Sequence, residues 1–276
     1  MLSAIAEYGF LQNAIFASIL ASVICGVIGV IIVEKKLLMM TGGIAHTAYG
    51  GVGLGYLLGF EPILGAAIFS VLASLIIGTV RRKNTANTDT IISLLWSLGM
   101  ACGIMFTALM QWYPPDMNSY LFGNIISVTK ADLYIMLPLT LVVLLLIAVF
   151  FNDWKSFLFD SRFAEIAGIK TAFLEYLLLI ITALSIVVLI RVVGIILLIA
   201  LLTAPAACAA LISKSLKARM LIAGILSLIF CFAGLSASYN LGIASGAAIV
   251  FISVITYFAM LIIKKLIRKN TQCDRF

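Results

Sequence analysis

Nine apolar stretches follow one another along this chain, with short polar connections between them. They lie near residues 10–33, 42–59, 62–80, 90–111, 133–151, 172–190, 193–212, 219–236 and 243–263. At 1.5 Å per helical residue, most are long enough to cross a hydrocarbon layer about 30 Å thick. An unpaired backbone amide or carbonyl is very costly in lipid, and helices pair these groups internally. The sequence therefore predicts an all-α integral membrane protein with about eight or nine transmembrane helices.

The Lys and Arg residues separate between alternate connections. Cytoplasmic connections of membrane proteins carry an excess of these residues. If residue 1 lies outside, only Lys130 and Arg191 are external. The other sixteen are cytoplasmic: Lys35, Lys36, Arg81, Arg82, Lys83, Lys155, Arg162, Lys170, Lys214, Lys217, Arg219, Lys264, Lys265, Arg268, Lys269 and Arg275. This bias predicts a multi-pass protein of the cytoplasmic membrane with its amino terminus outside and its carboxyl terminus in the cytoplasm.

Composition excludes several other classes of protein. With 64% hydrophobic and 11% charged residues, the chain is too apolar for a soluble domain. Its net charge of +7 is spread over short clusters without interleaved aromatic residues, so nucleic acid is not an expected partner. The first run carries Glu7 rather than a basic start and continues to Glu34, so we expect it to remain in the mature protein. Residues 1–276 are expected to form one transmembrane domain with a basic tail at 264–276.

A glycine-rich segment at 41–59 carries the single histidine of the chain, His46. Small residues let neighbouring helices approach closely, so we expect a central, buried helix that is broken at one end or serves only as a packing surface. An ionisable residue within a membrane span usually faces the bundle interior or a wet cavity. Neutral imidazole also suits zinc, manganese and iron ions. His46 is therefore a candidate for the substrate pathway and for metal binding.

Other residues allow both a structural and a functional interpretation. Asp89 opens the fourth apolar stretch, where an acid also complements the helix dipole. Pro205 is expected to break or kink the seventh stretch, and 193–212 is a candidate re-entrant segment. The polar segment 152–171 predicts a short amphipathic helix that ends at Gly168 and lies on the membrane or in a groove of a partner. Four intramembrane cysteines, Cys25, Cys102, Cys208 and Cys231, are interpreted as small apolar residues.

Five motifs in order resemble the bacterial permeases of zinc, manganese and iron ABC importers. They are Gly-Gly-Ile-Ala-His-Thr-Ala-Tyr-Gly-Gly-Val-Gly-Leu-Gly at 42–55, Asp-Thr-Ile-Ile-Ser at 89–93, Tyr120 to Leu133 with its Tyr-Leu-Phe-Gly start, Asp-Ser-Arg-Phe-Ala-Glu-Ile-Ala-Gly at 160–168, and Val193 to Ala209 with its Pro-Ala-Ala-Cys-Ala end. Together the matches span about residues 26–250. The chain has no Gly-x-x-x-x-Gly-Lys-Ser/Thr loop, so an ATPase that drives it must be another chain.

The resemblance implies a fold, a set of partners and a set of sites. It implies a permease homodimer, two cytoplasmic ATPase subunits that hold the ATP, and an extracellular metal-binding protein that delivers a divalent ion. No permanently bound cofactor and no catalytic residue are expected. The implied ATPase-coupling residues are Asp160, Arg162, Glu165 and Gly168. Those of the substrate pathway are His46, Asp89, Asn240 and Ser245, with His46 as the metal ligand and Cys25, Cys102 and Met105 as softer candidates.

Departures from the family pattern leave the cargo open. Position 43 is glycine where family members often have an acid, Ser97 stands where some zinc-type members have histidine, and 242–246 lacks an acid and a proline. These losses remove hard oxygen donors, which leaves a metal chelate or a small organic cofactor as the alternative cargo. An ATP-independent transporter or channel is a further alternative. It usually needs intramembrane acids, whereas most acids here lie at helix ends or in loops.

Overall fold

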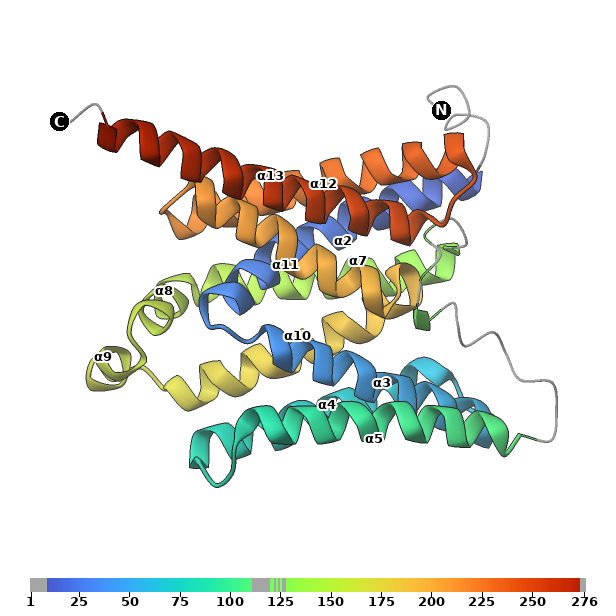
Figure 1. Ribbon diagram of the computed structural model, residues 1–276. Helices are drawn as coiled ribbons and strands as arrows, with labels where there is room; N and C mark the ends of the chain where they lie inside the picture. Colours follow the sequence, from blue (N-terminus) through green and yellow to red (C-terminus); the bar gives the residue numbers. More distant parts are fainter. Residues whose placement is uncertain (1–8, 111–119, 122, 124, 126–127, 274–276) are drawn as a thin grey trace.

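The computed structural model describes residues 9–110, 120–121, 123, 125 and 128–273, with side chains up to residue 266. Predictions that concern residues 1–8, the connection at 111–119, Phe122, Asn124, 126–127 and Arg275 lie outside the described residues. The described part contains nine long helices, which lie side by side in Figure 1. They are α2 (Gly9–Glu34), α3 (Leu38–Leu58), α4 (Pro62–Lys83), α5 (Thr88–Ala108), α7 (Lys130–Val149), α10 (Thr171–Val193), α11 (Ile195–Ile212), α12 (Leu216–Leu241) and α13 (Ser245–Cys273).

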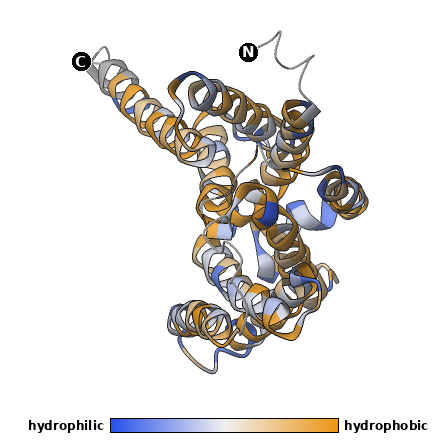
Figure 2. Ribbon diagram, turned by 90° about the vertical axis from the view of Figure 1, so that its right-hand side faces the viewer, coloured by the Kyte–Doolittle hydropathy of each residue, from blue (hydrophilic) through white to orange (hydrophobic). Residues whose placement is uncertain are grey.

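Eight of these helices are long and apolar enough to cross a membrane, which confirms the predicted count of eight or nine. Hydrophobic residues, in orange, predominate along the helices in Figure 2. The helix outside that set is α3, whose glycines lower its hydropathy although its 21 residues reach about 31 Å. The segment 193–212, a candidate re-entrant segment, contains α11, which is one of these eight helices. Gly194, with φ 78°, separates α10 from α11, and α11 then continues unbroken through Pro205 for 18 residues. Pro205 therefore does not break the helix.

Successive long helices run in opposite directions, so the connections gather at two ends of the bundle (Figure 1). One end, called the basic end here, holds the connections after α2, α4 and α11 and the segment between α7 and α10. There Arg81 and Arg82 pair with Glu175, and Arg219 pairs with Glu34. At the opposite end Arg191 lies 2.8 Å from Asp132 and 3.1 Å from Glu61. The predicted alternation of connections is therefore confirmed.

Helix α3 is buried between α4 and α5 because glycines face it from both neighbours. A Cβ on Gly50 would lie 2.8 Å from the Gly99 carbonyl oxygen of α5, and one on Gly55 would lie 2.7 Å from Pro62 Cα of α4. Such approaches leave no room for side chains, so the glycines set the helix spacing. The expectation of a break at one end was wrong, because α3 is continuous from Leu38 to Leu58.

Two short helices, α8 (Phe151–Phe159) and α9 (Ser161–Ile166), replace the single amphipathic helix that the segment 152–171 predicted. The break lies at Asp160, whose backbone is extended and whose Oδ1 accepts hydrogen bonds from the amides of Arg162 and Phe163. An aspartate is a preferred helix N-cap, so this acid starts a new helix instead of continuing the previous one. Helix α9 ends before Gly168, whose φ of 83° favours glycine.

Candidate functional site

His46 occupies an open position in an otherwise buried part of α3. From Met40 to Gly53 every residue of this helix is buried except His46, which is partly exposed. It lies about 12 Å along the helix from Leu38, so it is well inside the span rather than at its end. Among the residues of this stretch, the imidazole is the group that α3 presents to open space.

Two side chains of α5 hold the imidazole. The His46 ring stacks on the Trp96 indole, with ring centroids 4.0 Å apart and planes 15° from parallel. His46 Nδ1 lies 3.2 Å from Met100 Sδ. Glycine at 42 makes room for the indole, because a Cβ there would lie 2.8 Å from the Trp96 ring. The close approach of α3 and α5 thus fixes the orientation of the histidine.

The residues that contact His46 share one face of α5 with Asp89. Asp89, Ser93, Trp96 and Met100 follow the i, i+4, i+7, i+11 spacing of a single helix face. Asp89 and Ser93 are exposed, and Asp89 lies about 10 Å along the axis from Trp96, toward the basic end. Asp89 also belongs to the first turn of α5, but the side chain that caps this helix is Asn87. The structure therefore places His46 and Asp89 along one surface without direct contact.

The remaining pathway candidates lie elsewhere. Asn240 is exposed at the end of α12 and Ser245 is buried at the start of α13, both at the end opposite to Asp89. Cys102 lines an apolar hollow of about 210 Å³ beside α4, and Cys25 is fully buried. Met105 is exposed, but its position on α5 is turned away from the Asp89 face. One chain therefore does not bring these candidates together with His46.

Metal-binding groups do not cluster within the described residues. Among them no three His, Cys, Asp or Glu side chains lie close enough to hold an ion. The side chains that contact His46 are a thioether, which is a soft donor, and an indole, which is not a metal ligand, while the oxygen donors Asp89 and Ser93 follow along α5. Manganese prefers oxygen and imidazole ligands. Within one chain this arrangement offers single ligands along a surface rather than a closed cage.

The coupling candidates form an exposed surface at the basic end. Arg162, Glu165 and Gly168 are exposed, and Asp160 caps α9 as described above. Phe159, Phe163 and Ile166 are 92%, 62% and 86% exposed, while Ala164 is fully buried. An apolar patch rimmed by charges on a short helix is typical of a surface that docks on a protein or on a membrane. We call α8 and α9 with these side chains the α8–α9 surface.

Lys35 connects the α8–α9 surface to the start of α3. Its ammonium donates hydrogen bonds to the Phe157 carbonyl oxygen at 2.6 Å and to Ser161 Oγ at 2.7 Å. It also lies 3.6 Å from the centroid of the Phe157 ring. Burial, followed by the nearby Arg81, lowers the pKa of Lys35, while Glu175 and Asp160 oppose that shift. The Lys35 side chain thus joins the α2–α3 connection to the junction of α8 with α9.

Sequence reasoning missed Trp96, Met100 and Lys35 as parts of this arrangement. The spacing of Asp89, Trp96 and Met100 along a helix was readable from the sequence. The sequence did not indicate which face of α5 contacts His46, because that depends on the register between α3 and α5, two helices joined through α4. Lys35 counted only as one of many basic residues, and its hydrogen-bond acceptors lie more than a hundred residues away.

Comparison with known proteins places the chain in a family. The profile of the ABC 3 transport family matches residues 7–264. A membrane protein of Synechocystis sp. is 38% identical over 259 residues, which cover 94% of this chain and 92% of that protein.

A relative with a named transport role and a solved structure support the same placement. The manganese transport system membrane protein MntC of Listeria innocua is 33% identical over 257 residues, covering 93% of this chain and 91% of that protein. The solved structure of PsaBC from Streptococcus pneumoniae in complex with Fab superposes with a TM-score of 0.85 and 30% identity, over 94% of this chain and 93% of that one. This chain is therefore a multi-pass membrane protein that belongs to the ABC 3 transport family.

Proposed function

We propose that this chain is the permease subunit of an ATP-binding-cassette importer that moves a divalent metal ion across the cytoplasmic membrane. The observation that carries the proposal is the open position of His46 in a buried, glycine-packed helix, beside a face of α5 that bears Asp89. Manganese is the first candidate ion, because the relatives of known cargo, such as MntC of Listeria innocua, are named as manganese transporters. The whole chain, residues 1–276, acts as one transmembrane domain.

Two copies of the chain complete the ion path. Helix α5 buries the smallest share of its surface among the eight candidate spans, with Ile92, Gly99 and Gly103 as its buried residues. Ser93 and the partly exposed His46 carry polar groups on this face within the helices, which favours a partner protein or a wet path over it, and Asp89 lies at its basic end. A second copy facing it would contribute a second His46 and a second Asp89. The pair would supply imidazole and carboxylate ligands from both sides of the dimer axis.

The basic end faces the cytoplasm, and each permease copy receives one ATPase subunit there. The excess of Lys and Arg at this end supports that orientation, and the exposed α8–α9 surface supplies the docking site. ATP is bound by the ATPase chains. At the opposite end an extracellular solute-binding protein releases the ion near Asn240 and Ser245, where α12 and α13 meet. No resident cofactor is needed, since the metal ion is the cargo.

Transport proceeds by alternating access. ATP binding moves the ATPase subunits together, and the α8–α9 surfaces move with them. Because Lys35 joins this surface to the α2–α3 connection, the displacement reaches the start of α3 and hence His46. Helix α3 and α5 are packed through glycines, so they move as a pair and open the path to one side at a time.

Metal uptake in cells tests the proposal. The chain is expressed with the ATPase and solute-binding proteins of its own genome in bacteria that lack their own manganese importer. Wild type should restore uptake of radioactive manganese, and His46→Ala should reduce it by about tenfold or more at limiting metal, since a path ligand is lost. Thr79→Ala removes a half-buried polar group of α4 outside the path and serves as the control. Equal uptake by His46→Ala and Thr79→Ala contradicts the role of His46.

The second candidate cargo is a metal chelate or small organic cofactor. The stacked Trp96 ring and the Met100 thioether beside His46 favour such a ligand, because an indole and a thioether suit organic groups better than hard cations. A Cβ at Gly43 would also lie 2.7 Å from Ile92 Cγ2, which leaves little space for an acid at that position. Uptake of a preformed chelate without uptake of free manganese would favour this cargo over the ion.

A further inference from the structure

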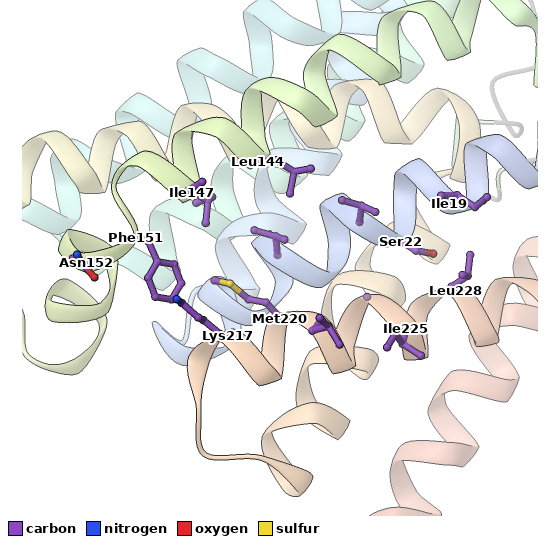
Figure 3. A pocket seen from close by; sticks show the side chains of 15 residues that line it. Ile19, Ser22, Leu144, Ile147, Phe151, Asn152, Lys217, Met220, Ile225 and Leu228 are labelled. Carbon is purple, nitrogen blue, oxygen red and sulfur yellow. The ribbon is translucent and has the colours of Figure 1, made fainter.

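An open groove on the outer surface of the bundle lies between α7 and α12, with α2 as its floor (Figure 3). Its volume is about 800 Å³. Apolar side chains line most of it, among them Val23 and Val27 of α2, Leu144 of α7, and Leu221 and Leu228 of α12. Leu144 and Leu221 are exposed, so the groove opens to the outside of the bundle. It lies apart from α3 and α5, which carry the proposed ion path.

The groove ends in polar groups at the basic end only. Figure 3 shows Phe151, Asn152 and Lys217 together at this end, while Ile19 and Leu228 lie at the other. The Lys217 ammonium is 4.9 Å from the centroid of the Phe151 ring, which holds the charge over the mouth of the groove. Ser22 is the remaining polar residue of the lining, and it is buried, with its Oγ 4.0 Å from Cys231 Sγ.

A second hollow continues from this mouth and adds positive charge. Asn152 lines both hollows, and the second, of about 710 Å³, also includes Lys155, Lys214 and Arg219. Glu34 is the acid in its lining and is paired with Arg219. Asp153 lines a separate hollow beside Lys170. The mouth of the groove is therefore positively charged overall.

The length of the groove matches one leaflet of a bilayer. Along α12 it extends from Lys217 to Leu228, which corresponds to a rise of about 16 Å. Half of a hydrocarbon core about 30 Å thick is about 15 Å. An acyl chain that begins at the level of Lys217 would therefore end near Leu228, with its headgroup beside the basic residues.

We propose that this groove binds an anionic phospholipid, with an acyl chain between α7 and α12 and the phosphate at Lys217 and Asn152. The groove supplies an apolar channel of leaflet length, and its mouth supplies the charge that selects an anionic headgroup. The orientation proposed above assigns this lipid to the cytoplasmic leaflet. The bound lipid would brace α7 and α12, which flank the α8–α9 surface, so it links membrane composition to the coupling region.

Native mass spectrometry of the purified full-length chain tests the headgroup contact. Phosphatidylglycerol and phosphatidylcholine with the same acyl chains are added in equal amounts. Wild type should retain phosphatidylglycerol preferentially, and Lys217→Gln should weaken that binding by about fivefold, the contribution of one basic residue near an anionic surface. Lys83→Gln, an exposed lysine of α4 at the same end, should bind as wild type does. Equal retention of both lipids by wild type contradicts the proposal.

A second pair of variants tests the acyl-chain contact independently of charge. Leu228 lines the groove, whereas its neighbour Ile229 is exposed outside it. Leu228→Trp should therefore reduce retention of phosphatidylglycerol, and Ile229→Trp should not, with thermal unfolding showing that both variants are folded. Identical lipid binding by the two folded variants overturns the groove assignment. Spontaneous disulfide formation between copies carrying Leu221→Cys in membranes would instead assign this face to a second copy of the chain, and would also refute the lipid.

Discussion

Replacing Lys35 with methionine is the sharpest test of how ATP hydrolysis reaches the ion path. The ammonium makes two hydrogen bonds to the junction of α8 and α9, at 2.6 and 2.7 Å. Hydrogen bonds to charged groups contribute about 1.5–3 kcal/mol each where they are buried. Lys35 is only half-buried, so we take about 2 kcal/mol for the whole contact, which corresponds to about a thirtyfold change in an equilibrium. Methionine keeps the unbranched side chain and removes the charge.

The assay separates a loss of coupling between ATP hydrolysis and metal uptake from a loss of folding. The permease is reconstituted with its ATPase subunits in proteoliposomes, and metal uptake and ATP hydrolysis are measured together. Lys35→Met should hydrolyse ATP but move about thirtyfold less metal per ATP, because α3 no longer follows the α8–α9 surface. The control is Lys36→Met, since Lys36 is the exposed neighbour in the same connection. A ratio of uptake to hydrolysis that is the same in both variants refutes the proposed link.

Three further changes test the packing and the charges. Gly99→Ala should lower the free energy of unfolding by about 3 kcal/mol, because its Cβ would lie 2.7 Å from the His46 carbonyl oxygen. The control is Gly224→Ala, whose Cβ would lie 3.8 Å from the nearest atom, and it should change the melting temperature little. Arg191→Met leaves the buried Asp132 carboxylate without its cation and should cost about 2 kcal/mol, seen as a lower melting temperature that Arg191→Met with Asp132→Asn partly restores. Reversing the charge of Arg162 or Glu165 should lower metal uptake per ATP by about tenfold without affecting the melting temperature. Reversing the charge of Lys83, an exposed residue outside the α8–α9 surface, should leave uptake per ATP unchanged. Uptake in the Arg162 or Glu165 variant equal to that of the Lys83 variant contradicts docking on this surface.

The helices and their alternation were predictable because lipid allows few alternatives. A run such as 219–236 must form a helix to pair its backbone, and the structure extends it to Leu216–Leu241. Predictions differed from the structure where packing or a capping hydrogen bond outweighed the pattern of the local sequence. Pro205 lies within α11, a helix largely buried among its neighbours, so one lost backbone hydrogen bond does not break it. Asp160, in contrast, broke a helix that hydrophobic spacing alone predicted as continuous, because its carboxylate caps the amides that follow.

The candidate site was predictable only in part. His46 was identifiable from its rarity in an apolar segment, and the glycines around it correctly indicated burial. The contact of His46 with Trp96 and Met100 was not predictable, since it requires knowing how far α5 slides along α3. For Asn240 and Ser245, the sequence indicated a site that the structure of one chain does not bring together with Asp89. They resemble pathway residues in sequence, yet within one chain they lie at the far end from Asp89, so only a path that runs the length of the bundle contains all four.

Helix α3 unites the two halves of the proposed mechanism. It begins next to Lys35, which is tied to the α8–α9 surface, and it carries His46 about two turns further along. Its glycines place it so close to α5 that a Cβ on Gly50 or Gly53 would lie within 3 Å of the α5 backbone. In the proposed mechanism, this close packing carries Trp96, Met100 and Asp89 along with the histidine when the α2–α3 connection moves. The glycine content that keeps α3 outside the eight candidate spans is thus also what packs it against α5, and the proposed mechanism uses this packing to move the ion path as one unit.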